Sequence, residues 1–326
     1  MNPNRRALLA ALAAIPAMSG TWARAQGAWP SKPIKILVGF PPGGGADAMA
    51  RLVAAKLPEK LGQPIVVDNR TGATGTICSE LVAKSPPDGY TLQLAHINSN
   101  AIGPLLVAKG RFDPINDFTP IALIGITPQM LCHHPKHKFA DVKALIAYAK
   151  ANPEKLSYAS SGVGSIQHIA GEAFCLAAGV KMLHVPFKGT GEALTALISG
   201  DVDTTFSSTG SALPQVNAGK LTLLAVCSPK RLPNFPNIPA VAETLKGYEI
   251  ATWYGLAGPA KLPKEIVTRL SAEVQAILKQ PEVAKRLQDL DAEVSSGTPE
   301  QFAAFWKKEI DKYRKIIAEA KIEGSA

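Results

Sequence analysis

Short apolar runs alternate with amphipathic stretches over most of the chain. Runs rich in β-branched and aromatic residues predict β-strands over residues 34–40, 64–69, 90–95, 120–126, 155–161, 182–187, 203–208 and 222–228. Apolar residues at helical spacing between these runs predict helices over residues 47–61, 76–83, 142–151, 165–178, 192–199 and 213–218. Strands that alternate with helices are typical of parallel sheets, so the pattern predicts an α/β fold.

The pattern changes after about residue 262, where two long amphipathic helices are predicted over residues 263–280 and 298–321. The second begins with Thr298, Pro299 and Gln301, which is the spacing of a capping box with proline in the first turn. The sequence has no repeat at solenoid period, which excludes a solenoid.

The N-terminus has the three zones of a secretory signal peptide. Arg5 and Arg6 precede an apolar segment over residues 7–18, and small residues follow at 23–25. We therefore predict that residues 1–25 are a cleaved signal peptide and that the protein works in the periplasm. A cytosolic N-terminal helix is the alternative, but the three zones in order argue against it. The apolar segment is too short to span a membrane.

The remaining chain of about 300 residues is long for one hydrophobic core, so two lobes are expected. The formal net charge of the whole chain at pH 7 is +9. This charge suits an anionic ligand without proving one. No long basic run with interleaved aromatic residues occurs, so we expect no nucleic-acid partner.

Four cysteines, Cys78, Cys132, Cys175 and Cys227, lie in apolar surroundings at wide, irregular spacing. In an oxidising compartment this pattern is as compatible with one disulfide as with buried free thiols, and both interpretations stay open. No C-x-x-C motif is present, so zinc or redox chemistry through cysteine is not expected.

Other candidate chemical groups are weaker. The segment HHPKH brings together His133, His134 and His137, but no nearby carboxylate completes a metal site, so we favour a solvated turn and predict no metal. Ser160 and Ser161 lie in a plausible loop without an identifiable base or orienting acid, and no G-x-S-x-G elbow occurs. We therefore predict no enzyme chemistry and no cofactor.

Three glycine-containing loops follow predicted strands and precede predicted helices. The first contains Gly43, Gly44 and Gly45, the second runs over residues 160–164 as SSGVG, and the third over residues 189–191 as GTG. Ligands of open α/β sheets bind at the carboxyl ends of the strands, and helix N-termini bind anions through free backbone N–H groups. The three loops are therefore expected to converge on one acidic group.

The first loop also fits the dinucleotide motif G-x-G-x-x-A over residues 43–48, with Asp68 where that fold places its ribose-binding acid. Pro41 and Pro42 precede the glycines, and export delivers the protein where soluble nicotinamide cofactor is scarce. Both points argue against a dinucleotide. An exported NAD(P)-dependent oxidoreductase is kept as an alternative function.

Eight blocks cover nearly all of the chain after the signal peptide, in order: KPIKILVGFPPGGGADAMAR, LGQPIVVDNRTGATGT, SPPDGYTLQL, DFTPIALIG, LIAYAKANPEKLSYASSGVGS, HVPFKGTGEALTALISGDVD, VNAGKLTLLAVCSPKRLPNFPNIPAVAE and WYGLAGPAKLP. Together they resemble the Bug receptors, also called the TctC family, which are periplasmic solute-binding proteins of tripartite tricarboxylate transporters. The resemblance implies a two-lobed periplasmic-binding-protein fold, type II-like, whose lobes are joined by crossover strands and close on a small ligand, usually a carboxylate.

In that family two glycine loops hold the ligand carboxylate through backbone amides, helix N-termini and ordered water. The resemblance places these loops at residues 40–47 and 160–165. The expected ligand-binding residues are Phe40, Gly43, Gly44, Gly45, Ala46, Asp47, Asn98, Ser160, Ser161, Gly164, Ser165, His168, Lys188 and Ser207.

These residues have different expected roles. The backbone of residues 43–46 would contact the carboxylate, with Ser161, Gly164 and Ser165 opposite. Asp47 is expected to cap its helix, because a second carboxylate beside the ligand would repel it. His168 could bind the ligand or pack, and packing is favoured.

The far end of the ligand would meet more variable positions. Candidates are Asn98 and Ser99, Lys188, and Ser207 or Ser208.

The chain departs from the family pattern at three places. His96 stands at a strand end where small or hydroxyl residues are usual, Phe187 stands where tyrosine is common, and residues 131–139 read LCHHPKHKF. The first departure bears on specificity at the far end of the ligand.

The resemblance implies one lobe from residues 26–124 plus 228–326 and another from residues 125–227. The expected function is capture of a mono- or dicarboxylate between the lobes for a tripartite tricarboxylate-type transporter, by a monomer that docks on a membrane permease. A neutral amide ligand stays possible. So does a receptor that presents its ligand to a membrane sensor kinase.

Overall fold

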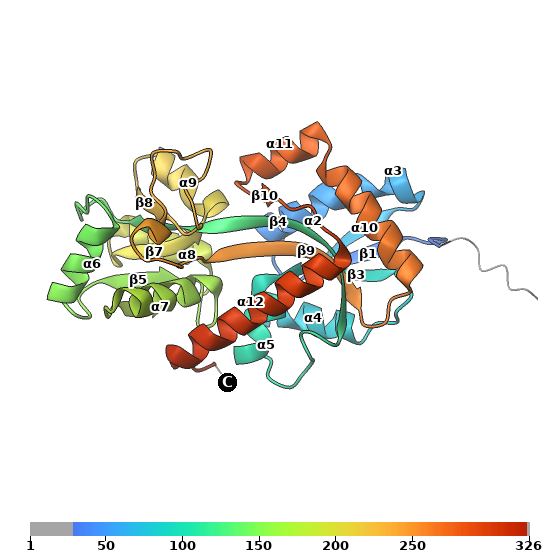
Figure 1. Cartoon of the computed structure of the whole chain (residues 1–326), viewed down its shortest axis with the longest axis horizontal. Coiled ribbons are helices and arrows are strands. Elements are labelled where there is room, and N and C mark those ends of the chain that lie inside the picture. The colour runs from blue at the N-terminus through green and yellow to red at the C-terminus, as the bar shows by residue number, and fades with distance from the viewer. Residues whose placement is uncertain (1–28, 325–326) are drawn as a thin grey trace, which may run out of the picture.

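The computed structural model describes residues 29–324, which form two lobes joined by two long strands (Figure 1). Strands β4 (Phe118–His133) and β9 (Ala251–Pro259) run from one lobe into the other, and β9 pairs antiparallel with β4 along its whole length. The predicted α/β fold, with lobes joined by crossover strands, is confirmed. The predicted signal peptide lies outside the described residues.

The first lobe is built on strands in the order β2-β1-β3-β9-β4, in which β1 is parallel to both of its neighbours. Its elements are β1 (Ile34–Val38), α2 (Gly45–Ala54), α3 (Leu57–Leu61), β2 (Ile65–Asn69), η1 (Ala73–Gly75), α4 (Thr76–Ala83), β3 (Thr91–His96), η2 (Asn98–Ile102), α5 (Gly103–Leu106), α10 (Lys264–Leu278), α11 (Pro281–Asp289), β10 (Glu293–Val294) and α12 (Pro299–Glu319).

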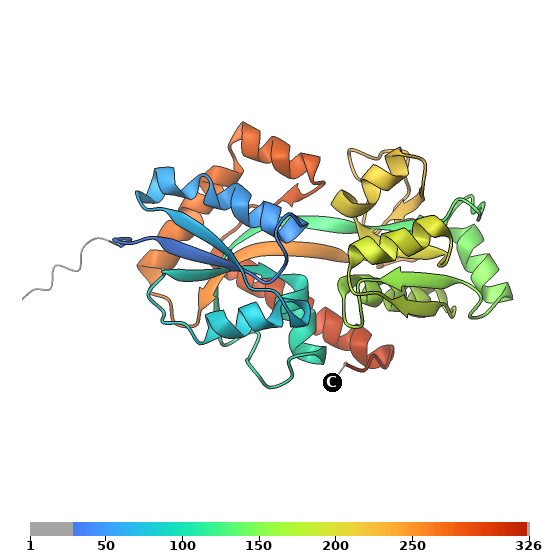
Figure 2. The same ribbon diagram turned by 180° about the vertical axis from the view of Figure 1, so that it is seen from behind.

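The second lobe continues the sheet in the order β4-β7-β5-β6, with β8 also paired to β4. Its green to yellow segments lie at the other end of the two crossover strands from the blue segments of the first lobe (Figure 2). Strand β5 is parallel to β6 and β7. Its elements are α6 (Val142–Ala151), β5 (Ser157–Ser160), α7 (Ile166–Ala178), β6 (Leu183–Pro186), α8 (Thr190–Ser199), β7 (Thr204–Ser208), α9 (Thr209–Asn217) and β8 (Thr222–Val226), followed by η3 (Val241–Glu243) on the return to β9.

The helix predicted over residues 47–61 is two helices in the structure. Helix α2 ends at Ala54 and α3 begins at Leu57, with Pro58 in the first turn of α3. Proline has no N–H to donate to the carbonyl of Ala54 and its ring clashes with that carbonyl. The same proline suits the start of a new helix, which explains the break.

Strand β9 and helix α11 were not predicted, and the strand expected over residues 120–126 extends over residues 118–133. All nine residues of β9 are buried. A strand covered on both faces lacks the alternation of apolar and polar residues that marks a half-buried strand. The lobe boundary expected at residue 124 falls inside β4, and the exact division of the chain stays a prediction.

Helix α12 lies along the molecule and contacts β4 in the sheet and α7 in the second lobe (Figure 1). Its predicted capping box is confirmed, because Gln301 N donates to Thr298 Oγ1 at 3.3 Å and Thr298 N donates to Gln301 Oε1 at 2.8 Å. The buried Trp306 of this helix stacks on Phe118 and donates its indole N–H to the carbonyl of Asn100 at 3.0 Å. The helix thus ties the hinge strands to both lobes.

The four cysteines are buried free thiols, so the disulfide interpretation is wrong. The HHPKH segment is only partly a solvated turn: His133 is buried on β4, and His137 contacts the Asp203 carboxylate at 2.7 Å. In the described chain no helix is both long and apolar enough to cross a bilayer, and no cluster of three potential metal ligands occurs.

Candidate ligand-binding site

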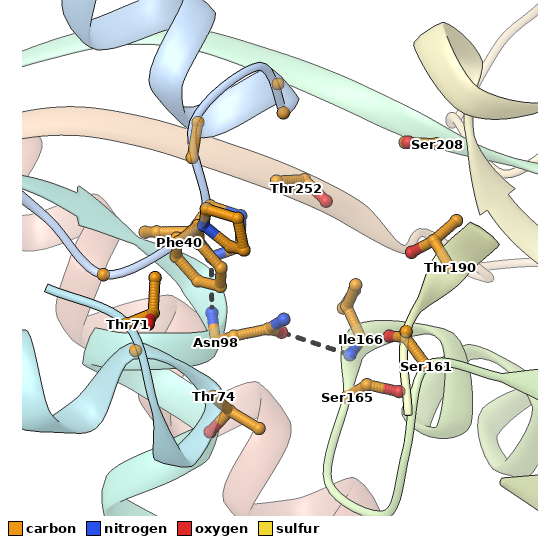
Figure 3. A pocket seen from close by; sticks show the side chains of 18 of the residues that line it. Phe40, Thr71, Thr74, Asn98, Ser161, Ser165, Ile166, Thr190, Ser208 and Thr252 are labelled. Atoms are coloured by element: carbon orange, nitrogen blue, oxygen red, sulfur yellow. Dashed lines mark hydrogen bonds between the residues drawn. The ribbon is translucent and has the colours of Figure 1, made fainter. Parts of the chain in front are cut away.

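A cleft of about 770 Å³ lies between the lobes, at the carboxyl ends of three parallel strands from each lobe (Figure 3). Its first-lobe wall comes from the loops after β1, β2 and β3, and its second-lobe wall from the loops after β5, β6 and β7. The crossover strands form the floor. The lining residues are Gly39, Phe40, Pro41, Pro42, Gly43, Gly44, Gly45, Ala46, Thr71, Gly72, Ala73, Thr74, Gly75, His96, Asn98, Gln129, Ser161, Ser165, Ile166, Gln167, Lys188, Gly189, Thr190, Ser208, Ser211, Thr252 and Tyr254.

Five helices begin at this cleft. The N-cap residues of α2, α4, α7, α8 and α9 are Gly44, Gly75, Ser165, Gly189 and Ser208, and all of them line it. Each helix N-terminus carries free N–H groups and the positive end of the helix dipole. The five helices therefore place a positive potential in the cleft without five cationic side chains.

Among the described lining residues Lys188 is the one with a cationic side chain, and none has a carboxylate. His96 is neutral, because burial lowers the pKa of its ring to about 3. The helix N-termini and Lys188, with no carboxylate among the described lining residues, favour an anion.

The first glycine loop is held in shape by Asp47, which lies beneath the lining. Its carboxylate accepts from Gly43 N at 2.9 Å, Arg51 Nε at 2.8 Å and Asn69 Nδ2 at 3.0 Å. These bonds, led by that from the Arg51 guanidinium, lower the pKa of Asp47 to about 2. The Asn69 amide also donates to the carbonyl of Phe40 at 2.9 Å. Asp47 is thus a positioning residue for the loop that lines the cleft.

The second loop is organised by Gln167, which sequence reasoning missed. Its Oε1 accepts from Ser161 N at 2.6 Å, and its Nε2 lies 3.4 Å from Thr190 Oγ1 and 3.5 Å from Ser207 Oγ. One buried side chain therefore links the loop after β5, the first residue of α8 and the end of β7. Ser165 caps α7 by accepting from His168 N at 3.3 Å.

Five expected ligand residues do not line the cleft: Asp47, Ser160, Gly164, His168 and Ser207. For Ser160, Gly164 and Ser207 this corrects the expected contact with the ligand, whereas packing was already favoured for His168. Asp47 was expected to cap α2, but the N-cap is Gly44 without a side-chain bond, and the Asp47 carboxylate accepts from Gly43 N instead. All five residues are buried among the elements behind the loops. The remaining expected residues, Phe40, Gly43, Gly44, Gly45, Ala46, Asn98, Ser161, Ser165 and Lys188, are brought together as lining.

His168 packs face to face on His184, with ring centroids 3.8 Å apart. The Nδ1 atom of His168 accepts from Gly164 N at 3.2 Å, and His184 Nε2 lies 2.6 Å from Ser160 Oγ. Burial lowers the pKa of His168 to about 3 and that of His184 to about 4, so both rings are neutral. This stack supports the second loop from behind.

The floor and one wall contain residues that sequence reasoning did not single out. On the crossover strands, Gln129 Nε2 donates to Thr252 Oγ1 at 2.9 Å, and Tyr254 follows Thr252 on the same face of β9. The wall after β2 is formed by residues 71–75, whose sequence TGATG is a fourth glycine-containing loop between a strand and a helix. That loop carries the same signal as the three that were identified.

The dinucleotide interpretation gains no support from this geometry. Asp68 pairs with Arg70 at 2.9 Å and is not among the lining residues, so it does not face the first glycine loop as a ribose-binding acid would.

Comparison with known proteins places the chain in a family. The sequence model of the tripartite tricarboxylate transporter family receptor (TctC) matches residues 49–322. Protein BugT of Bordetella pertussis (strain Tohama I) is 33% identical over 295 residues, which are 89% of this chain and 90% of BugT.

Two solved structures are similar over the whole described fold. An R. palustris protein with adipate has a TM-score of 0.83 and 35% identity, covering 91% of this chain and 100% of that one. MatC from Rhodopseudomonas palustris with bound malate has a TM-score of 0.78 and 32% identity, covering 89% and 100%. The chain therefore belongs to the TctC, or Bug, family of periplasmic solute-binding receptors.

Proposed function

We propose that this protein captures a small organic acid, a mono- or dicarboxylate, in the cleft between its lobes and delivers it to a tripartite tricarboxylate-type permease. The observation that carries the proposal is the convergence of five helix N-termini on a cleft whose described lining has no carboxylate. Backbone N–H groups at helix N-termini bind carboxylates without an arginine clamp.

Binding is proposed to close the lobes about β4 and β9. A ligand that contacts both walls stabilises the closed state by the contacts that it makes only there. The walls already meet at one point, because Ile166 N of the second lobe donates to Asn98 Oδ1 of the first at 3.1 Å (Figure 3).

We propose that the protein catalyses no reaction and works as a monomer. Ser160 and His184 are a serine and histidine in hydrogen-bonding contact, as in hydrolases, but Ser160 is fully buried and does not line the cleft. A nucleophile must reach its substrate. This pair therefore supports the loop.

Similar proteins support the ligand class. The two solved relatives described above hold adipate and malate, which are both dicarboxylates. A cleft of about 770 Å³ has room for acids of this size, and Lys188 is a cation that can meet a second carboxylate.

The test is calorimetric titration of the purified protein with adipate, malate and smaller organic acids, after native mass spectrometry has identified any acid that co-purifies. Two glycines of one loop offer a matched pair of variants. Gly189 lines the cleft and Gly191 does not, and a Cβ at either position meets nothing within 4 Å.

We expect Gly189→Leu to weaken acid binding about 10-fold or more by filling the cleft, and Gly191→Leu to leave it unchanged. Failure of every acid to bind the wild-type protein would overturn the proposed ligand class. Uptake of the identified acid by cells that lack the protein should be restored by the wild type and by Gly191→Leu, but not by Gly189→Leu. Normal uptake without the protein would contradict the transport role.

A further inference from the structure

His96 ends β3 at the cleft with a ring that is held rigidly. The residue is 6% exposed, and its ring packs between Phe40, at a centroid distance of 4.4 Å, and Tyr254, at 5.2 Å. All three residues line the cleft. The position and orientation of the imidazole are therefore fixed before any ligand arrives.

The hydrogen bond that His96 makes fixes its tautomer. Asn98 N donates to His96 Nδ1 at 3.0 Å, so Nδ1 must carry a lone pair. Because burial keeps the ring neutral, its one proton is on Nε2. The one hydrogen bond of the His96 ring within the described chain is this bond to Nδ1, and His96 lines the cleft, so Nε2–H is left for a partner in the cleft.

An N–H donor that lines a binding cleft bonds to water until a ligand acceptor replaces that water. Asn98 also lines the cleft just after this strand, and its Oδ1 is already engaged because it accepts from Ile166 N. The neighbouring floor offers the hydroxyls of Tyr254 and Thr252, so this side of the cleft is polar along the body of a ligand.

We propose that His96 is a specificity-determining residue, whose Nε2–H donates to a ligand oxygen other than those of the carboxylate held at the helix N-termini. The cleft then selects acids that have a second oxygen function, which can be a hydroxyl, a carbonyl or a second carboxylate, over plain monocarboxylates. A neutral N–H group can donate to a hydroxyl, a carbonyl or a carboxylate oxygen, because each of these is an acceptor and no charge is required. This inference rests on the proposed function and names the substrate class.

The test compares butyrate with succinate and malate, three four-carbon acids of which butyrate alone lacks a second oxygen function. Calorimetry on the wild type is expected to give affinities for succinate or malate about 10-fold or more above that for butyrate. In His96→Leu this ratio is expected to fall about 3-fold or more, with butyrate itself little changed, and the preference for diacids that is left is expected from Lys188. His96→Gln, whose amide nitrogen reaches the place of Nε2, should keep most of the discrimination.

A wild-type measurement makes the test independent of how the variants fold. In ¹⁵N-resolved NMR spectra of the imidazole, the Nε2–H signal of His96 should shift on addition of the better-bound acid, and Nδ1 should stay unprotonated. The inference is overturned if butyrate binds as tightly as both diacids, if His96→Leu keeps the wild-type ratio, or if the Nε2–H signal does not move.

A six-carbon pair, adipate and hexanoate, extends the same comparison if none of the four-carbon acids binds. Binding of both members with equal affinity overturns the role of His96 and leaves the proposed function standing. Absence of binding by every acid overturns the proposed function, and the inference with it.

Discussion

The backbone N–H of Ile166, the first residue of α7, donates across the cleft to Asn98 Oδ1 at 3.1 Å. This bond joins the second lobe to the first at the N-terminus of a helix that faces the cleft (Figure 3). It satisfies one of the free N–H groups that the helix start would otherwise leave to water or to a ligand. The same contact therefore favours closure of the lobes and competes with a ligand for the N–H groups at the start of α7.

Two substitutions of Asn98 separate these effects. Asn98→Ala removes the acceptor, and we expect acid affinity to fall only about 5-fold, because one neutral hydrogen bond that favours closure is lost. Asn98→Asp keeps an acceptor for Ile166 but places a negative charge beside the anion, so affinity should fall about 100-fold. Titration calorimetry gives both values. Equal affinity of the Asp variant and the wild type would show that the acid does not bind near α7.

Replacing Asp47 by Asn should destabilise the protein by about 1 to 2 kcal/mol at neutral pH. The lowered pKa of Asp47 indicates a favourable interaction of this size, reduced because its partner Arg51 is largely exposed and screened by solvent. Urea unfolding of both proteins measures the difference. Acid affinity should also fall, because the bond from Gly43 N that shapes the first loop is weakened, and an unchanged affinity would contradict that role.

The stability difference between the wild type and Asp47→Asn should depend on pH in a defined direction. The folded-state pKa of about 2 lies below the ordinary value of 3.8, so the stabilisation is full above about pH 4 and is lost as pH falls through 2. Other carboxylates titrate in both proteins and cancel in the difference. A difference that grew on acidification would contradict this assignment.

The parts of the fold that were predictable depend on local signals. Gly43 to Gly45, Ser165 and Thr298 mark helix starts that glycine, serine or a capping box identifies without tertiary information. Strand β9 depends instead on pairing with β3 and β4, which are far away in sequence. Its composition alone does not reveal that both of its faces are covered.

The candidate site divides in the same way. Its loop residues are predictable from glycines that follow strands. Residues 71–75 have the same pattern and were not recognised. The residues of the floor cannot be predicted from such a local pattern, because only strand register brings Gln129 beside Thr252, at a sequence separation of 123 residues. Gln167 was missed because a glutamine in a first helical turn is ordinary, and its role depends on the loop after β5, the start of α8 and the end of β7 meeting there.

The same substitution in two helices of the second lobe should have opposite effects. A Cβ at Gly171 of α7 would overlap the ring of the buried Tyr158, so we expect Gly171→Ala to cost about 2 to 4 kcal/mol. A Cβ at Gly191 of α8 meets nothing within 4 Å, and Gly191→Ala should be neutral or stabilise by up to about 1 kcal/mol. Thermal and urea unfolding measure both changes. Similar stability of the two variants would contradict the packing of α7 on β5.

The four buried thiols should be unreactive in the folded protein. Burial raises the pKa of Cys78, Cys132 and Cys175 to about 12 and that of Cys227 further, and only the thiolate is a nucleophile. We expect a thiol reagent such as Ellman's reagent to modify none of them in buffer and all four in denaturant. A reductant should leave the melting temperature unchanged, because no disulfide is present to reduce. Fewer than four reactive thiols in freshly unfolded, unreduced protein would instead reveal a disulfide and a different packing around these side chains.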